Sequence, residues 1–307
     1  MRALAIAFAC AALCGPVFAA DAPVPTCQLP QIASLDMETE DSGVVTVPVT
    51  INDMSGRWLV DTGNVTSMVA DTVARRLGLR RTLNPLGGAL LGGIAIREFA
   101  TADTVTFAGM RASRVTLALA PEAVLPSNTI GMLAPDVMRN YDIEFDFAAG
   151  KFNVFEPNSC PGHAVYWTHS VFAQVPIKLD AVGHITIPVT LDGKTLTAAV
   201  DTGAEGSIMS LDAARELFGI DAGNPALKSL GDQEINGLAR AAAYRYPFAS
   251  LTLEGVAVGN PNITILKTGG YHHGLPDLVL GIETLRQLHM YIAYQEGAIY
   301  LTPAEAR

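Results

Sequence analysis

The chain has 307 residues, of which 50% are hydrophobic and 16% are charged, and its formal net charge is −10. This composition is that of a globular protein with a sizeable core, and it excludes a disordered chain. The acidic balance, without a Lys/Arg-rich run, argues against nucleic acid as a partner. The length suits one large domain or two of ordinary size.

Residues 1–19 are predicted to be an export signal. Arg2 supplies a positive start, the stretch Ala3–Phe18 is apolar or small almost throughout, and small residues permit cleavage after Ala19. A membrane anchor is the alternative, but the stretch is short for a full span and Cys14-Gly15-Pro16 interrupts it. We therefore expect an exported protein of a bacterial envelope, periplasmic or extracellular, without stable membrane insertion.

Cysteine usage agrees with export. Cleavage would remove Cys10 and Cys14 and leave Cys27 and Cys160. In an oxidising compartment two cysteines are a candidate for one disulfide. Two unpaired thiols remain the alternative, because the sequence does not give the distance between them.

An internal repeat organises the rest of the chain. An alternating strand pattern at Val45–Ile51 is followed by a turn and an apolar strand that runs into Asp61-Thr62-Gly63. The second half repeats this order with Ile185–Leu191 and Asp201-Thr202-Gly203. The two triplets lie 140 residues apart. Repeats of this kind indicate two copies of one structural unit.

The match extends beyond the triplets. A helix pattern follows each of them, at 71–79 and 212–220, and each half closes with strands around a glycine turn. The remaining short runs, rich in Val, Ile and Thr, predict an all-β fold with few helices. The predicted organisation is a signal peptide at 1–19, an N-terminal segment at 20–41, a first lobe at 42–156, a linker at 157–179 and a second lobe at 180–303.

Each aspartate stands at the end of an apolar strand, after Val60 or Val200, where a carboxylate is costly to ionise alone. The following Thr offers a hydroxyl that donates and accepts, and the Gly permits a tight turn with open backbone N–H groups. A duplicated strand-to-turn signal without chemistry is the alternative, since Asp and Gly are common in turns.

Val-Asp-Thr-Gly, a small residue, a serine six positions after the aspartate and a later apolar-apolar-Gly together resemble aspartic peptidases of the retropepsin and pepsin type. The resemblance spans roughly 42–156 and 180–303. It implies a bilobal acid-protease fold of two pseudo-symmetric lobes. The short lobes and Ala204 are more similar to a retropepsin subunit, as if a retropepsin dimer were fused into one chain.

The resemblance also implies a site. Asp61 and Asp201 would share one proton and activate a water for hydrolysis of peptide bonds, without metal or cofactor. Thr62 and Thr202 would brace the two loops, and Gly63 and Gly203 would bring N–H groups to the carboxylates. Lobe one departs from lobe two in having Asn64 where lobe two has Ala204. We hypothesise that Asn64 donates to Asp61 and makes it the more acidic partner.

Two glycine-rich segments are expected to be flaps over the cleft, one within 85–94 and one around 231–238. Simple flexible loops are the alternative. The flap residues proposed are Gly87, Gly88, Leu91, Gly92, Gly93 and Gly237.

The resulting expectation is an aspartic endopeptidase that acts as a monomer on protein or peptide substrates. Two alternatives stay open: a non-catalytic exported peptide-binding protein with the same fold, and an inactive form in which Asp21–Ile32 blocks or braces the cleft. His272-His273 has no third ligand at recognisable spacing, so no metal site is predicted.

Overall fold

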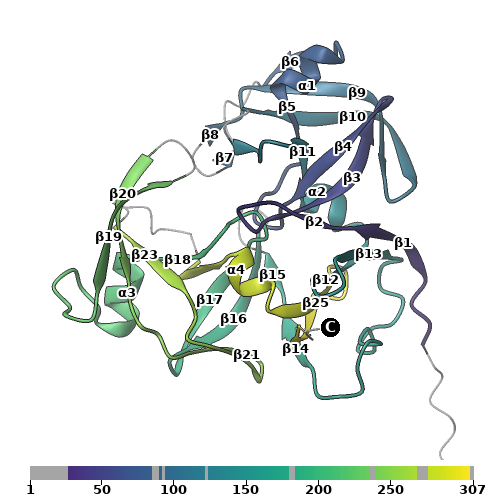
Figure 1. Ribbon diagram of the computed structural model, residues 1–307. Coiled ribbons are helices and arrows are strands. Elements are labelled where there is room, and N and C mark those ends of the chain that lie inside the picture. The colour runs from purple at the N-terminus through teal and green to yellow at the C-terminus, as the bar shows by residue number, and fades with distance from the viewer. Residues whose placement is uncertain are drawn as a thin grey trace, which may run out of the picture.

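A computed structural model describes residues 27–84, 90–91, 94–121, 124–179, 184–235, 239–267 and 276–304. It consists of two strand-rich lobes and a third sheet between them (Figure 1). This confirms the predicted all-β, bilobal architecture. Within these described ranges, no helix is long and apolar enough to cross a membrane.

The first lobe is built on an eight-stranded sheet in the order β2-β3-β4-β11-β5-β10-β9-β6, and the pairing of β3 with β9 curls it into a barrel-like shape. Its elements are β2 (Glu38–Thr39), β3 (Val45–Ile51), β4 (Met54–Val60), β5 (Met68–Ala70), α1 (Asp71–Arg76), β6 (Arg80–Leu83), β9 (Glu98–Phe107), β10 (Met110–Ala120), β11 (Thr129–Leu133) and α2 (Pro135–Met138).

The second lobe repeats this plan in a ten-stranded sheet whose main path is β19-β20-β23-β18-β24-β17-β16-β21-β22. Its elements are β15 (Lys178–Leu179), β16 (Ile185–Leu191), β17 (Lys194–Val200), β18 (Ser207–Ser210), α3 (Leu211–Phe218), β19 (Lys228–Ile235), β20 (Ala239–Arg245), β21 (Ser250–Leu253), β22 (Val256–Gly259), β23 (Ile263–Leu266), β24 (Leu278–Leu280) and α4 (Ile282–Leu285). The sequence repeat is therefore a structural repeat.

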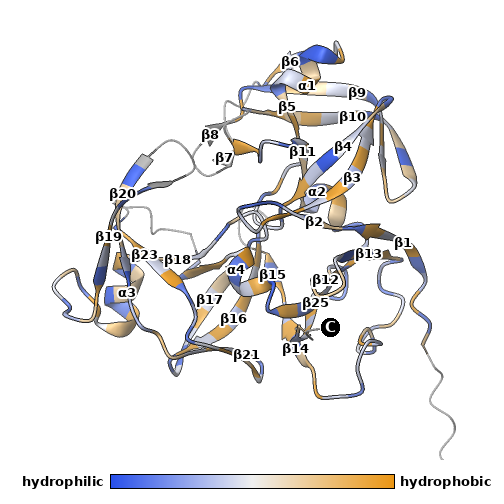
Figure 2. Cartoon of the chain, viewed as in Figure 1, coloured by the Kyte–Doolittle hydropathy of each residue, from blue (hydrophilic) through white to orange (hydrophobic). Residues whose placement is uncertain are grey.

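Helix α3 shows how local sequence fixes these elements. The Ser210 side chain accepts from the Ala213 N–H at the start of the helix, and Gly219 ends it in the left-handed region at φ 67°. Leu211 and Ala214 are buried, while the opposite side is hydrophilic (Figure 2). The helix pattern of the second lobe is thus confirmed, and its counterpart α1 is shorter than the pattern at 71–79.

A six-stranded sheet joins the two halves, in the order β1-β13-β12-β25-β26-β14. Its strands are β1 (Gln31–Asp36), β12 (Asp142–Asp146), β13 (Lys151–Phe155), β14 (Ala173–Pro176), β25 (Leu288–Ala293) and β26 (Ala298–Pro303). At its centre β12 of the first half pairs with β25 of the second. Strands β1 and β14 form the edges of this sheet, which was not predicted from the sequence.

The shared sheet has one apolar and one mixed face, because successive residues of a strand point to opposite sides. On β12, Ile143 and Phe145 enter the main core, whereas Asp142, Glu144 and Asp146 lie on the other face. That face also carries a smaller apolar cluster with Phe155, Tyr291 and Tyr300. It is covered by residues 156–168, which we call the strap.

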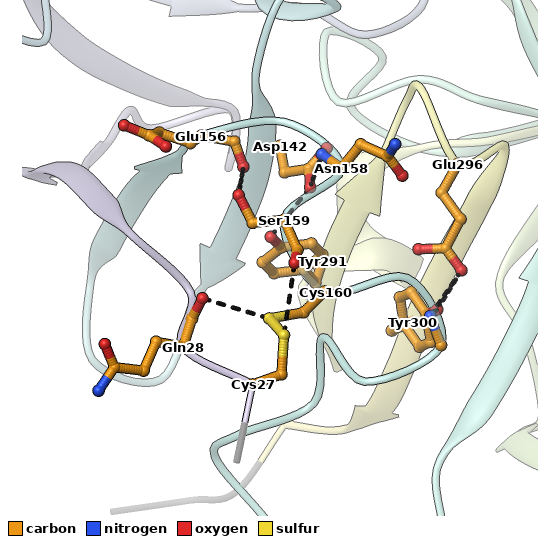
Figure 3. The surroundings of a disulfide bond; sticks show 11 residues. Cys27, Gln28, Asp142, Glu156, Asn158, Ser159, Cys160, Tyr291, Glu296 and Tyr300 are labelled. Atoms are coloured by element: carbon orange, nitrogen blue, oxygen red, sulfur yellow. Dashed lines mark hydrogen bonds between the residues drawn. A yellow bond between two sulfur atoms is a disulfide. The ribbon is translucent and has the colours of Figure 1, made fainter. Parts of the chain in front are cut away.

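The strap is held by specific contacts. Tyr166 Oη donates to Glu144 Oε2 at 2.7 Å, and the Trp167 ring stacks on His289 of β25 with centroids 4.3 Å apart. A disulfide between Cys27 and Cys160 ties the strap to the residues before β1 (Figure 3). The structure thus contains the pairing that the sequence left open.

Candidate active site

The two triplets leave their sheets at equivalent places. Strand β4 pairs in parallel with β11, and the Asp61 N–H donates to Leu133 O at 2.9 Å. In the second lobe β17 pairs in parallel with β24, and the Asp201 N–H donates to Leu280 O at 3.0 Å. Each apolar strand therefore delivers its aspartate to the seam between the lobes.

The threonines lock the two loops together. The Thr62 N–H donates to Thr202 Oγ1 and the Thr202 N–H donates to Thr62 Oγ1, both at 3.1 Å. Thr62 Oγ1 donates in turn to Val200 O, and Thr202 Oγ1 to Val60 O, both at 2.7 Å. Both threonines are fully buried, so all four hydrogen bonds are shielded from water.

Backbone donors hold each carboxyl group in the same way. Asp61 Oδ1 accepts from the N–H groups of Gly63 and residue 64 at 2.9 and 3.0 Å. Asp201 Oδ1 accepts from Gly203 and residue 204 at the same two distances. The open N–H groups expected of the Gly turns are thus in place.

The glycines also allow the carboxyl groups to meet. A Cβ added to Gly63 would collide with the carboxyl group of Asp201, and one added to Gly203 would collide with that of Asp61. Only a residue without a side chain fits these positions. The two carboxyl groups therefore lie close together at the seam, as two carboxyl groups that share a proton must.

Burial sets the charge state of the pair. Burial raises the pKa of Asp61 well above its ordinary range, and repulsion by Asp201 raises it further. Burial also raises the pKa of Asp201, partly offset by the N–H groups of Ala204 and Gly203. Asp61 is buried, while Asp201 is partly exposed. The two carboxyl groups therefore favour a form in which one is protonated and the other ionised, and the titration belongs to the pair rather than to either residue.

The hypothesis that Asn64 makes Asp61 the more acidic partner is wrong. The Asn64 side chain donates to Thr66 O and to Met132 Sδ, both at 3.0 Å, and not to Asp61. Only its backbone N–H reaches Asp61, as that of Ala204 reaches Asp201. The amide side chain braces its own loop and does not stabilise the charged form.

A second pair of contacts was missed by the sequence reasoning. Ser67 donates from Oγ to Asp136 Oδ1 at 2.5 Å and from N to Oδ2 at 2.9 Å, which ties the Asp61 loop to α2. In lobe two Ser207 instead shares a hydrogen bond with Thr284 of α4 at 2.8 Å. The repeated serine was the available signal, but the two partners differ between the halves.

The proposed flaps lie largely outside the described residues, including Gly87, Gly88, Gly92, Gly93 and Gly237. Leu91 belongs to β7 (Leu90–Leu91), which pairs with β8 (Ile94–Ala95) in an antiparallel hairpin. In the second lobe β19 and β20 form a longer hairpin around 236–238. The action of both segments on a substrate stays a prediction.

Candidate metal ligands do not gather in the described part of the chain, where no three His, Cys, Asp or Glu side chains could hold an ion. His272 and His273 fall outside it.

The sequence around both triplets also matches a known protein family. A family model described as aspartyl protease matches residues 47–134 and 187–284, which is more than half of the chain and includes both triplets. The chain belongs to this aspartyl protease family.

Solved structures show the same bilobal fold. The match to the basic 7S globulin from soybean covers 90% of this chain and 97% of the globulin chain, with a TM-score of 0.51 and 11% sequence identity. The match to conglutin gamma from lupine seeds covers 90% of this chain and 95% of the conglutin chain, with a TM-score of 0.50 and 11% sequence identity. These likenesses concern the fold alone. No curated protein matches the sequence.

Proposed function

We propose that the chain is an aspartic endopeptidase in which Asp61 and Asp201 activate one water. The observation that carries this proposal is the pair of carboxyl groups that meet at the seam, each held by two backbone N–H groups of its own loop. Membership of the aspartyl protease family supports it.

We assign the two roles by exposure, since Asp61 is buried and Asp201 is partly exposed. Ionised Asp201 takes a proton from a water held between the carboxyl groups, and the resulting hydroxide attacks the carbonyl carbon of the scissile amide. Protonated Asp61 donates to the carbonyl oxygen as negative charge develops there. When the C–N bond breaks, the proton held by Asp201 passes to the leaving nitrogen. Water and amide thus give an acid and an amine, without a covalent intermediate.

Cleavage of a mixed peptide library tests the proposal. Asp61→Asn and Asp201→Asn are each expected to lower kcat by 10²-fold or more, since each removes a group that handles a proton. Asp142→Asn is the matched control, because it changes a buried aspartate of the shared sheet. Unchanged cleavage by either site variant would reject the dyad. Peptide binding without any cleavage by the wild type between pH 3 and 8 would favour a non-catalytic binding protein.

We also propose that the protein is exported and works as a monomer. The Cys27–Cys160 disulfide is consistent with an oxidising compartment. Both halves of the site come from one chain, so no partner is needed to complete it. The predicted signal peptide lies outside the described residues.

A further inference from the structure

A pocket of about 420 Å³ lies away from the aspartate pair, and none of its lining residues belongs to either triplet. Three parts of the chain form its walls: the connection from β1 to β3, the turn between β12 and β13, and the residues that follow α4 and β26. Its size is that of sites for small organic molecules.

The lining has a distinct chemical character. Met37, Val45 and Phe147 supply apolar surface, and Gln287 adds a polar group. Arg286 is the one charged side chain among the lining residues that the structure describes. A ligand that matches this lining has an apolar body and a negative charge.

The Arg286 guanidinium is placed to meet such a charge. A Cβ built on Gly43 would lie 3.7 Å from Arg286 Nη1, so the guanidinium lies against this glycine at the pocket wall. Arg286 is exposed and forms no ion pair with any residue of the described ranges.

Neighbouring cations differ in this respect. Arg57 pairs with Glu38 at 3.3 Å and Lys151 pairs with Asp36 at 2.5 Å, both beside the same connection. Within the described residues, Arg286 differs from other exposed arginines without an ion pair, such as Arg111, in that it lines a pocket with apolar walls, where its charge is available to a ligand.

We propose that this pocket binds a small carboxylic acid with an apolar body. The carboxylate lies on the Arg286 guanidinium, which suits paired N–H···O contacts, and the apolar part lies against Met37, Val45 and Phe147.

The pocket is connected to the second catalytic loop through a very short helix. Arg286 follows α4, and its N–H donates to Ile282 O at 2.9 Å. At the other end of α4, the Ile282 N–H donates to Ala204 O at 2.7 Å and the Glu283 N–H to Glu205 O at 3.1 Å. A ligand on Arg286 is therefore expected to change the rate of cleavage. This effect on rate rests on the proposed function, whereas binding does not.

Calorimetric titration with octanoate tests binding, with octanol and octylamine as probes of the same chain length. Octanoate is expected to bind the wild type at least tenfold more tightly than either control. Arg286→Gln is expected to weaken octanoate binding at least tenfold, and Arg111→Gln, a change at an exposed arginine of β10, should leave it unaltered. Equal affinity for octanol, or equal octanoate affinity in Arg286→Gln, would overturn the site.

A second variant tests the location without a change of charge. Ala304→Phe places a large side chain in the pocket wall and is expected to abolish octanoate binding, with the wild-type far-ultraviolet circular dichroism as the check on folding. Undiminished binding by this variant would place octanoate elsewhere and overturn the proposal.

Activity is a separate readout. If octanoate binds as expected and no peptide is cleaved, the pocket stands and the proposed function fails. If peptides are cleaved at a rate that saturating octanoate leaves unchanged, the coupling through α4 is refuted.

Discussion

Thr62 and Thr202 each accept a hydrogen bond from the backbone N–H of the other, at 3.1 Å in both directions. Every hydrogen bond that their hydroxyls make crosses from one lobe to the other. The alignment of the aspartates therefore depends on two buried side chains that belong to the same seam.

Thr62→Val is expected to lower the free energy of unfolding by about 2–4 kcal/mol. Valine has nearly the same shape but leaves the Thr202 N–H and the Val200 carbonyl without partners in a buried place. Urea unfolding of the full chain measures the change. Thr62→Ser keeps the hydroxyl and should cost much less, so equal losses for the two variants would contradict the argument.

Asn64→Ala is expected to leave the acid limb of the pH–rate profile where it is. The Asn64 side chain contacts Thr66 and Met132 rather than the carboxyl pair. Its removal should lower stability by about 1 kcal/mol, because the Thr66 carbonyl loses a donor. Measured rates from pH 3 to 8 check this, and a displaced acid limb would show that the amide does reach Asp61.

Asp142 should make stability depend on pH. Burial raises its pKa from 3.8 to about 6. Because the folded state favours the protonated form, its contribution is fully present below about pH 3.8 and is lost as the pH rises through about 6. The loss is of the order of 2–3 kcal/mol at 1.4 kcal/mol per pKa unit.

Asp142→Asn isolates this effect, since asparagine stays neutral and its oxygen can still accept from Asn158 and Tyr291. The difference in unfolding free energy between the two proteins should change between pH 4 and 7, with the variant gaining on the wild type as pH rises. Parallel stability curves would rule out Asp142 as the titrating group.

The disulfide should contribute to stability because it closes a loop between residues 133 positions apart. Replacing Cys27 and Cys160 by serine is expected to cost about 2–5 kcal/mol. Unfolding with and without reductant measures this, and the double variant serves as the control that reductant should not affect. Protein cleaved after Ala19 should titrate no reactive thiol, and a thiol titre of one or two per chain would contradict the bond.

The sequence predicted the structure correctly where a local residue pattern was compatible with only one type of secondary structure. Val45–Ile51 and Ile185–Leu191 became equivalent strands, because alternation of apolar residues fixes both the strand and its buried face. The repetition of Asp-Thr-Gly predicted two equivalent loops, and the resemblance to aspartic peptidases implied that their aspartates meet at a seam.

Other features depended on contacts that no pattern of a single segment contains. Residues 141–147 and 290–294 were recognised as strands, but their pairing with each other unites two distant parts of the chain. Asp136 was not recognised because a lone aspartate in a short helix has many roles. The Asn64 error had a similar origin: the residue type gave the capacity to donate, and only the fold decides which atoms accept its hydrogen bonds.

The shared sheet has a consequence for how the protein behaves on dilution. Strands β12 and β25 pair at Glu144 and Tyr291, so backbone hydrogen bonds join the two halves within one molecule. A site assembled from separate subunits would dissociate as the protein is diluted. Here we expect the specific activity to be independent of protein concentration, down to the lowest concentration that can be assayed.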